Sequence, residues 1–333
     1  MAASGSMMGA VEPQPHPPAH GWWPWAKRIA AWLFFAIVIF LIVRQARTID
    51  WSDVLDSVRA IPLPMLLSAL FLAVCSHALY STYDLLGRHM TGHTLATGTV
   101  MGVTFISYAF NLNLGSLVGG VAFRYRLYSR LGLGNNTITR VLGFSMLTNW
   151  FGYLVVAGAA FCFWPMDLPP DWRIDGSGLR LLGAALLLVG VAYLALCAIA
   201  REHTWRIRDH ELDTPSLRFA LLQLAMSFAN WCLIGGVIWC LLQQQLAYPT
   251  VLAVFLVAAV AGVITHVPGG LGVLEAVFIA LLSHRVPQEK LLGALLAYRA
   301  IYYLLPLIVA SLFYVVTELR AKRLRKRGPA PQT

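Results

Sequence analysis

The sequence predicts an all-α polytopic membrane protein with about six full transmembrane helices and two re-entrant, Gly-rich hairpins, eight membrane segments in total. Three observations lead to this prediction: the composition, the long apolar runs and the distribution of basic residues. Of the 333 residues, 58% are hydrophobic and only 12% are charged, whereas a soluble domain carries about 25% charged residues. This composition is typical of membrane proteins.

Six apolar runs are long enough to cross a membrane as helices. They cover residues 28–45, 62–83, 141–164, 179–200, 219–242 and 291–317. Residues 50–60 instead predict a short amphipathic helix on the membrane surface, because Trp51, Val54, Leu55 and Val58 share one helical face.

Two further apolar regions are interrupted by glycines. Region 95–123 is broken at Leu112–Gly120, and region 249–283 is broken at His266–Gly272. Each region is either one full crossing or a hairpin that enters and leaves by the same face of the membrane. Positive charge decides between them, because cytoplasmic loops carry an excess of Lys and Arg.

With the N-terminus inside, two hairpins place about 17 basic residues inside and about 7 outside, whereas two full crossings give about 11 and about 13. The sequence therefore favours hairpins, with both termini cytoplasmic. The resulting order of elements has the layout of an inverted repeat, a recurring plan among transporters.

We expect three parts in the chain. Residues 1–25 form a disordered cytoplasmic tail, residues 26–318 a single transmembrane domain, and residues 319–333 a polybasic cytoplasmic tail. The net charge of +10 is explained by topology and not by nucleic-acid binding. The sequence predicts no cofactor, metal ion or catalytic residue, because phosphate-binding loops, nucleophile elbows and metal-ligand spacings are absent from it.

The second Gly-rich break is the strongest candidate for a binding site. Gly269, Gly270 and Gly272 permit unusual dihedral angles, and the helix that restarts near Leu271 would aim free N–H groups at the break, where they suit a phosphate or a carboxylate. A packing kink without a ligand is the alternative. Non-helical backbone in a bilayer is tolerated only inside protein or along a wet cavity.

Two charged side chains accompany this break. Glu275 follows the glycines, and Arg299 lies inside the last span, flanked by Tyr298, Tyr302 and Tyr303. Because charge at membrane depth is unfavourable, each is expected to be paired or functional. We expect Arg299 to bind Glu275 or a lipid phosphate, with a purely structural ion pair as the alternative.

The first hairpin ends in the basic segment VAFRYRLYSR, in which Arg124 and Arg126 follow Gly120. These arginines either anchor the topology or capture an anionic head group from the inner leaflet. Asn111 and Asn113 precede the break and would line a polar cavity if buried. On the second span His77, Tyr80 and Asp84 share a face, as a polar stripe or as a proton relay.

Three segments carry a family resemblance. HVPGGLGVLEAVFIALL, LLAYRAIYYLLPL and LVGGVAFRYRLYSRLGL resemble the conserved blocks of the YbhN-like membrane proteins, which share the transmembrane region of lysylphosphatidylglycerol synthases (MprF flippase-like proteins). The resemblance spans most of residues 25–320. It implies lipid translocation without lipid synthesis, since the soluble synthetase domain is missing here, and it implies location in the bacterial inner membrane. The family's motifs match Gly269, Gly270, Gly272, Glu275, Arg299 and Tyr302 in the second block and Gly120, Arg124 and Arg126 in the first.

One departure from the family pattern concerns the first block. Many relatives have a Gly–Glu pair there, whereas this chain has Gly119–Gly120, so a symmetric acid in the first hairpin is not expected.

The predicted function is binding, and flipping or scrambling, of an anionic phospholipid or related lipid. The expected partners are membrane lipids and a lipid-synthesis enzyme. Two alternatives remain at this point: a non-transporting scaffold for a lipid-synthesis or envelope enzyme, and a membrane-embedded transferase that modifies lipid-linked substrates.

Overall fold

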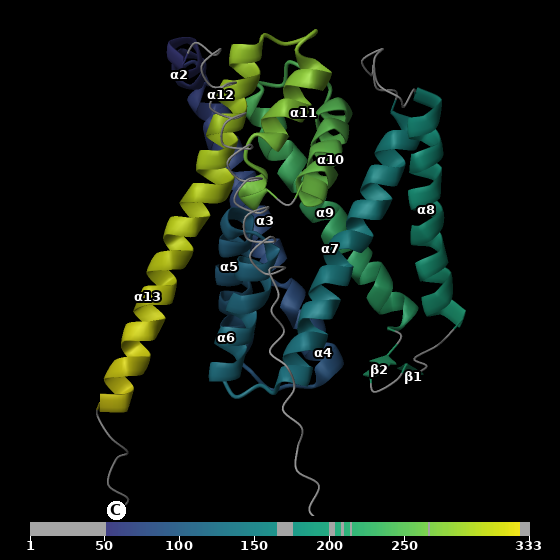
Figure 1. The fold of residues 1–333 in the computed structure, drawn as a ribbon, viewed down its shortest axis with the longest axis vertical. Coiled ribbons are helices and arrows are strands. Elements are labelled where there is room, and N and C mark those ends of the chain that lie inside the picture. The colour runs from purple at the N-terminus through teal and green to yellow at the C-terminus, as the bar shows by residue number, and fades with distance from the viewer. Residues whose placement is uncertain are drawn as a thin grey trace, which may run out of the picture. The chain divides into compact units, whose positions relative to one another are not determined.

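The computed structural model describes residues 51–164, 176–199, 204–207, 210–213, 215–265 and 267–326, all within the compact unit Asp50–Thr333. The predicted first span, the N-terminal tail and His266 lie outside the described residues. Those that are described form an α-helical membrane fold, as predicted, with one short β-ribbon (Figure 1).

The described chain begins with the predicted amphipathic helix, α2 (Trp51–Arg59). Val54 on this helix is buried and Leu55 is exposed, so its apolar residues divide between the protein and the surroundings. Pro62 then caps α3 (Leu63–Ser81), and α4 (Tyr83–Thr91) ends at Gly92 in the left-handed region (φ 68°). A left-handed glycine is a common helix stop because it has no Cβ to clash.

The first hairpin consists of α5 (Thr97–Leu114), the π-helical segment η1 (Ser116–Ala122) and α6 (Phe123–Arg130). The chain reverses at Gly115, and η1 and α6 return along α5 (Figure 1). Gly119 makes this approach possible, because a Cβ on Gly119 would lie 2.1 Å from the backbone nitrogen of Asn111.

Three long helices follow. These are α7 (Asn135–Phe163), α8 (Gly176–Ile199) and α9 (Leu217–Leu241). Between α8 and α9 lies a two-stranded antiparallel ribbon, β1 (Thr204–Ile207) and β2 (His210–Asp213), which the sequence analysis did not predict. The hydroxyl of Ser216 caps α9 by accepting a hydrogen bond from the Phe219 N–H.

The second hairpin consists of α10 (Tyr248–Thr265), the one-turn segment η2 (Pro268–Gly270) and α11 (Val273–Leu282). Gly269, Gly270 and Gly272 all have positive φ, which a residue with a Cβ adopts only at an energetic cost. The predicted break is present, and α11 restarts at Val273, close to the predicted Leu271.

The chain closes with α12 (Gln288–Tyr298), the π-helical segment η3 (Arg299–Leu304) and α13 (Leu305–Lys326). Pro306 explains the π-helical turn, because proline has no N–H to donate and its ring displaces the preceding turn. The predicted polybasic segment extends α13 as far as Lys326.

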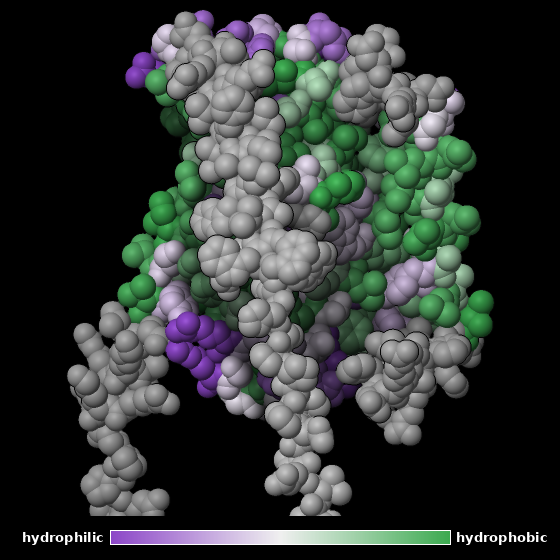
Figure 2. Space-filling model, viewed as in Figure 1, coloured by the Kyte–Doolittle hydropathy of each residue, from purple (hydrophilic) through white to green (hydrophobic). Residues whose placement is uncertain are grey.

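Six helical segments of the described chain are long and apolar enough to cross a membrane. Five correspond to predicted spans, and the sixth is α10, an arm of the second hairpin. Large apolar side chains such as Phe71, Leu117 and Leu181 are 67–79% exposed, an arrangement that favours lipid contact over water. Figure 2 shows hydrophobic residues at mid-height of the visible face, with hydrophilic residues toward the top and the bottom.

The two hairpins lie at opposite ends of the helical bundle. In Figure 1 the first hairpin occupies the lower half and the second the upper half, so the two Gly-rich tips point toward each other. The tips are in contact, since α5 packs against η2. The two tips thus approach each other from opposite ends of the described bundle, and the inverted repeat itself stays a prediction.

We predict that Gly119→Ala destabilises the protein by about 1–3 kcal/mol or more, because the new methyl group collides with backbone that cannot move aside. Thermal unfolding in detergent, followed by size-exclusion chromatography, measures the effect. Gly98→Ala is the matched control, since a Cβ at Gly98 has nothing within 4 Å. Equal melting temperatures of the two variants would contradict the close approach.

Candidate functional site

The Arg299 guanidinium joins the last helix to the tip of the second hairpin. Its Nε lies 2.6 Å from Oε1 of Glu275, and its Nη2 lies 3.1 Å from Oε2. The same guanidinium donates from Nη1 to the carbonyl of Gly269 and from Nη2 to the carbonyl of Gly270, each at 2.9 Å. The predicted pairing with Glu275 is therefore present, in the two-point geometry that arginine forms with carboxylates.

The glycine turn creates the acceptors that Arg299 satisfies. Positive φ at Gly269 and Gly270 turns their carbonyls away from helical partners, and in a membrane such carbonyls need donors from the protein. Glu275 lies in the first turn of α11, where the helix dipole favours a negative charge. Gly272 precedes this helix without a side-chain cap, so the first N–H groups of α11 face the turn.

The tip of the first hairpin completes this site. A Cβ on Gly269 would lie 3.3 Å from the carbonyl oxygen of Leu112. The side-chain amide of Asn113 donates to the carbonyls of Ala109 at 2.9 Å and Tyr303 at 3.2 Å. Since the Tyr303 ring centroid is 5.4 Å from the Arg299 guanidinium carbon, Asn113 connects the first hairpin to the segment that carries Arg299. We call the contact between Arg299, Glu275 and the two tips the tip site.

A second arginine, in the first hairpin, makes a buried ion pair with an acid on α4. The Nε of Arg124 lies 2.9 Å from Oδ2 of Asp84, which also accepts a hydrogen bond from the Tyr128 hydroxyl at 2.9 Å. Arg124 further donates to the Gly120 carbonyl and to the Ser145 hydroxyl. The side chains of Arg124 and Asp84 are 3% and 0% exposed. Arg124 is therefore bound inside the protein, although head-group capture was one of its two predicted roles.

The two arginines make similar contacts from different places in the chain. Arg124 lies within the first hairpin, just after η1, whereas Arg299 is the first residue of η3 and reaches the second hairpin from the last helix. Each pairs with one acid and binds a carbonyl of a Gly-rich segment, and π-helical segments are often found at functional sites. They differ in exposure, because the Arg299 and Glu275 side chains are 12% and 21% exposed. The tip site is thus accessible from outside, whereas the Asp84–Arg124 pair is sealed.

A directional chain of hydrogen bonds runs beside the tip site. The hydroxyl of Ser76 donates to Oδ1 of Asn230 at 2.7 Å, so it must accept from the Tyr302 hydroxyl, also at 2.7 Å. The Tyr302 hydroxyl in turn accepts from Tyr108 at 3.0 Å. The chain joins α5, η3, α3 and α9 through buried side chains. Tyr302, a predicted lipid-binding residue, therefore faces the core.

His77 lies against this chain and has one defined tautomer. Its Nδ1 is 2.9 Å from the carbonyl of Ala73, which only accepts, so Nδ1 carries the proton. Its ring packs 4.6 Å from that of Tyr302 and 5.3 Å from that of Tyr108, between centroids. His77, Tyr80 and Asp84 are all buried, but Asp84 lies on α4 and not on the helix that carries His77 and Tyr80.

The remaining predicted residues are placed as follows. Arg126 is exposed on α6, and Asn111 lies at the first tip with its Oδ1 beside Gly120.

Sequence reasoning missed Ser76, Tyr108 and Asn230, and it missed Asp84 as the partner of Arg124. One signal was available, because no other acid lies between Asp84 and Asp167 to neutralise the arginines of the first hairpin. No cluster of three His, Cys, Asp or Glu side chains suited to a metal ion occurs in the described residues.

Comparison with known proteins identifies the family of this chain. The family model described as the lysylphosphatidylglycerol synthase TM region matches residues 29–310. The chain belongs to this family. It is 47% identical over 313 residues to the inner membrane protein YbhN of Escherichia coli, covering 94% of this chain and 98% of YbhN. This family membership and the apolar helices identify a multi-pass inner-membrane protein of the YbhN-like group.

Two other relatives differ in how much of their length is similar to this chain. A protein of Synechocystis, named uncharacterized protein slr0712, is 33% identical over 298 residues, covering 88% of this chain and 92% of that protein. A phosphatidylglycerol lysyltransferase of Staphylococcus haemolyticus is 44% identical over 67 residues, which are 20% of this chain and 8% of that enzyme. The likeness to the lysyltransferase thus concerns a short segment.

We predict that Asp84→Asn and Arg124→Ala each destabilise the protein by about 3–5 kcal/mol, because either change leaves a buried charge without its partner. Yield and melting temperature in detergent report this loss. Arg126→Ala removes an exposed arginine from the same helix and is expected to leave both unchanged. Stable Asp84→Asn and Arg124→Ala proteins would show that the pair does not hold the hairpin.

We predict that Tyr302→Phe lowers stability by about 1–3 kcal/mol, because Tyr108 loses its acceptor and Ser76 its donor inside the core. Tyr125→Phe, which removes a hydroxyl bonded to Thr139 at an exposed position, is the matched control. Melting curves compare the stability of the two variants. A Tyr302→Phe protein as stable as the control would exclude the directional chain.

Proposed function

We propose that this protein binds an anionic phospholipid at the tip site and moves it between the leaflets of the inner membrane. The observation that carries the proposal is the partly exposed Arg299–Glu275 pair at the contact of two Gly-rich hairpin tips. In this proposal both hairpins are re-entrant, and both termini are cytoplasmic.

A lipid phosphate is a chemically suitable substitute for Glu275. Arginine binds carboxylates and phosphates with the same two-point geometry. A phosphate that displaced the Glu275 carboxylate would leave the bonds from Arg299 to the Gly269 and Gly270 carbonyls in place. The free N–H groups at the start of α11 add to the attraction for an anion. Binding and release are then an exchange of acidic partners on one fixed guanidinium.

The first hairpin takes a different part in this proposal. Arg124 is sealed against Asp84 and has no exposed surface for a lipid, so it holds the hairpin rigid. Arg126, on another side of the same helix, is exposed and attracts anionic head groups to that end of the protein. The directional chain through Tyr302 fixes the segment next to Arg299, so that the tip site keeps its geometry during exchange.

The name of one relative supports an anionic phospholipid as the substrate. By its name, the Staphylococcus haemolyticus relative acts on phosphatidylglycerol, an anionic lipid with one phosphodiester. We therefore propose phosphatidylglycerol or a lipid with a similar head group as the substrate, and the proposal contains no chemical step on that lipid.

A scaffold without transport is the second candidate. It is favoured by one observation: both arginines already have acidic partners within the protein. In a scaffold for a lipid-synthesis enzyme these pairs would be permanent, and their conservative substitution would affect folding alone.

Reconstituted liposomes with head-group-labelled phosphatidylglycerol test the proposal. Arg299→Lys keeps the charge but loses the fork, and Glu275→Gln keeps the shape but loses the charge. Each is expected to slow transbilayer movement by about tenfold or more, the effect of losing a charge-assisted hydrogen bond. Arg218→Lys and Glu289→Gln repeat the same chemistry away from the tip site and are expected to move lipid at the wild-type rate.

The contradicting results are equally specific. Wild-type rates of lipid movement in both tip-site variants would show that Arg299 does not bind the lipid phosphate. Wild-type protein that moves no more lipid than empty liposomes would favour the scaffold.

A further inference from the structure

The tip site holds one positive and one negative charge, and the surrounding chain supplies few others. Glu275 is the only acidic residue among positions 214–288, and no Lys or Arg occurs among positions 219–284. In the described part of the second hairpin, Arg299 and Glu275 therefore have only each other as charged partners.

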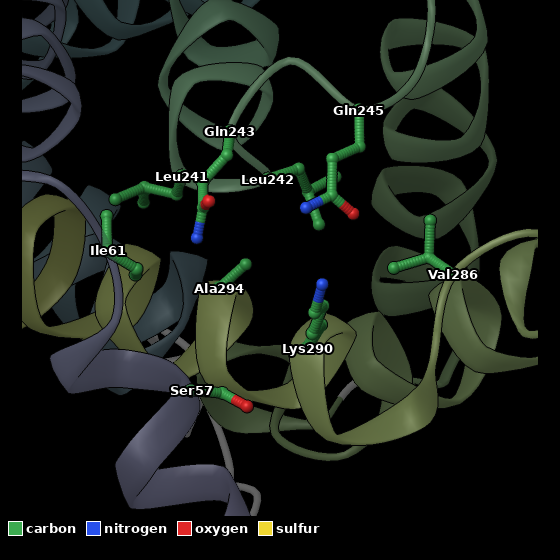
Figure 3. A pocket seen from close by; sticks show the side chains of 9 residues that line it. All are labelled: Ser57, Ile61, Leu241, Leu242, Gln243, Gln245, Val286, Lys290 and Ala294. Carbon is green, nitrogen blue, oxygen red and sulfur yellow. The ribbon is translucent and has the colours of Figure 1, made fainter.

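The nearest bases along the chain lie at the other end of this hairpin. Arg285 follows the last turn of α11. Lys290 lies in the first turn of α12 and points toward the Gln245 side chain (Figure 3). Arg299 is nine residues further along the same helical segment, a rise of about 14 Å. Neither base is therefore placed to replace Arg299 as the partner of Glu275.

Exchange of acids at Arg299 leaves one carboxylate without a partner. In the proposed function a lipid phosphodiester takes the place of the Glu275 carboxylate on the guanidinium, so one negative charge replaces another. The residues that border the two tips are apolar, and Leu117 and Leu271 are 79% and 52% exposed toward the surroundings. An ionised carboxylate without a partner is strongly unfavourable at membrane depth.

Three kinds of cation could neutralise the displaced carboxylate: a base of the protein, a cationic group of the lipid, or a proton. The described residues offer no further base at this place, and phosphatidylglycerol carries no cationic group. A proton is the remaining choice. A protonated carboxyl also gains an O–H donor, which suits the phosphate oxygen that then lies on Arg299.

The groups that face Glu275 leave this proton to it. The helices packed against α11 are α10 and α12. The titratable side chain of α10 is Tyr248 at its outer end, and the one at the tip end of α12 is Tyr298. On η3, Tyr303 lies against the Arg299 guanidinium. Tyrosine and arginine side chains already carry their protons near neutral pH.

We propose that an anionic lipid binds at Arg299 together with a proton, which Glu275 takes up as its carboxylate leaves the guanidinium. The O–H bond of Glu275 is the only covalent bond that forms. Water supplies the proton, and the reverse step returns it when the carboxylate displaces the lipid. The net charge of the tip site is then zero both with and without lipid. The proposal rests on the proposed function and adds the coupling of lipid to a proton.

Proton uptake on lipid binding tests the coupling without reference to transport. Purified full-length protein in phosphatidylcholine nanodiscs is titrated with dihexanoyl phosphatidylglycerol in weak buffer, while a pH-indicator dye records protons and calorimetry records binding. Empty nanodiscs supply the blank. We expect uptake of about one proton per bound lipid, and an affinity that falls about tenfold per pH unit while Glu275 is ionised in the lipid-free protein. The lipid phosphodiester stays ionised throughout, so it does not cause this dependence.

Three variants locate the proton. Glu275→Gln is a neutral substitute for the protonated acid, and it is expected to bind the lipid without proton uptake and without dependence on pH. Glu289→Gln makes the same change in the first turn of α12. His266→Gln removes the histidine that precedes the turn in the sequence. Both of these variants are expected to take up the proton as the wild type does.

A pH gradient across liposomes tests the consequence for transport. Because lipid and proton move together in this proposal, an alkaline interior is expected to concentrate labelled phosphatidylglycerol in the inner leaflet, and a protonophore is expected to abolish the asymmetry. An equal distribution in the presence of the gradient, from a protein that moves the lipid, would contradict the coupling.

Failure of the coupling is distinguishable from failure of the proposed function. Lipid binding by the wild type without proton uptake would overturn the coupling alone, and so would uptake that Glu275→Gln retains or that His266→Gln abolishes. A wild-type protein that binds no phosphatidylglycerol at any pH would remove the lipid site and the coupling together.

Discussion

The constraint on which this structure depends is the need for hydrogen-bond donors wherever the backbone of a membrane protein leaves the helix. At the second hairpin this need is met by a single side chain, Arg299, which binds the carbonyls of Gly269 and Gly270. The charge of Arg299 then requires a partner, which Glu275 supplies. Backbone geometry and charge pairing at the tip site thus follow from one requirement.

The same solution occurs twice, with different consequences. At the first hairpin Arg124 binds the Gly120 carbonyl and an acid, but the acid comes from α4 and the pair is wholly buried. A buried pair of this kind resists change, because removing one partner leaves the other charge uncompensated. The pair of the second hairpin keeps some exposure. In the function we propose, it is this pair that exchanges its acid for a lipid phosphate, while the buried pair supports the first hairpin.

Much of this arrangement was predictable from the sequence, because its signals are local. Long apolar runs predict the helices, and the glycines at 269, 270 and 272 predict the break between α10 and α11. Arg299 and Glu275 could be paired in advance because few other charges share their depth. The hairpin itself was harder, since α10 has enough apolar residues to cross a membrane alone.

The features that were missed depend on contacts between distant residues. Asp84 and Arg124 lie on different helices and are 40 residues apart, and no spacing rule connects them. The chain from Tyr108 through Tyr302 and Ser76 to Asn230 draws on four elements, each of which reads as an ordinary apolar helix. The β-ribbon lies in a charged loop without strand periodicity. The π-helical turn at Arg299 was in principle readable from Pro306, because its missing N–H disturbs the preceding turn.

The membrane topology of the two hairpins tests the proposed tip site most directly. Single cysteines at Thr94, Asn136, Ala247 and His284, all exposed loop or helix-end positions, are introduced after the five native cysteines are replaced. Each is then labelled with a membrane-impermeant maleimide in oriented vesicles. If both hairpins are re-entrant, Thr94 and Asn136 react from one side, and Ala247 and His284 react from the other. Labelling of Thr94 and Asn136 from opposite sides would show that the first hairpin crosses the membrane, and would contradict a site formed by two re-entrant tips.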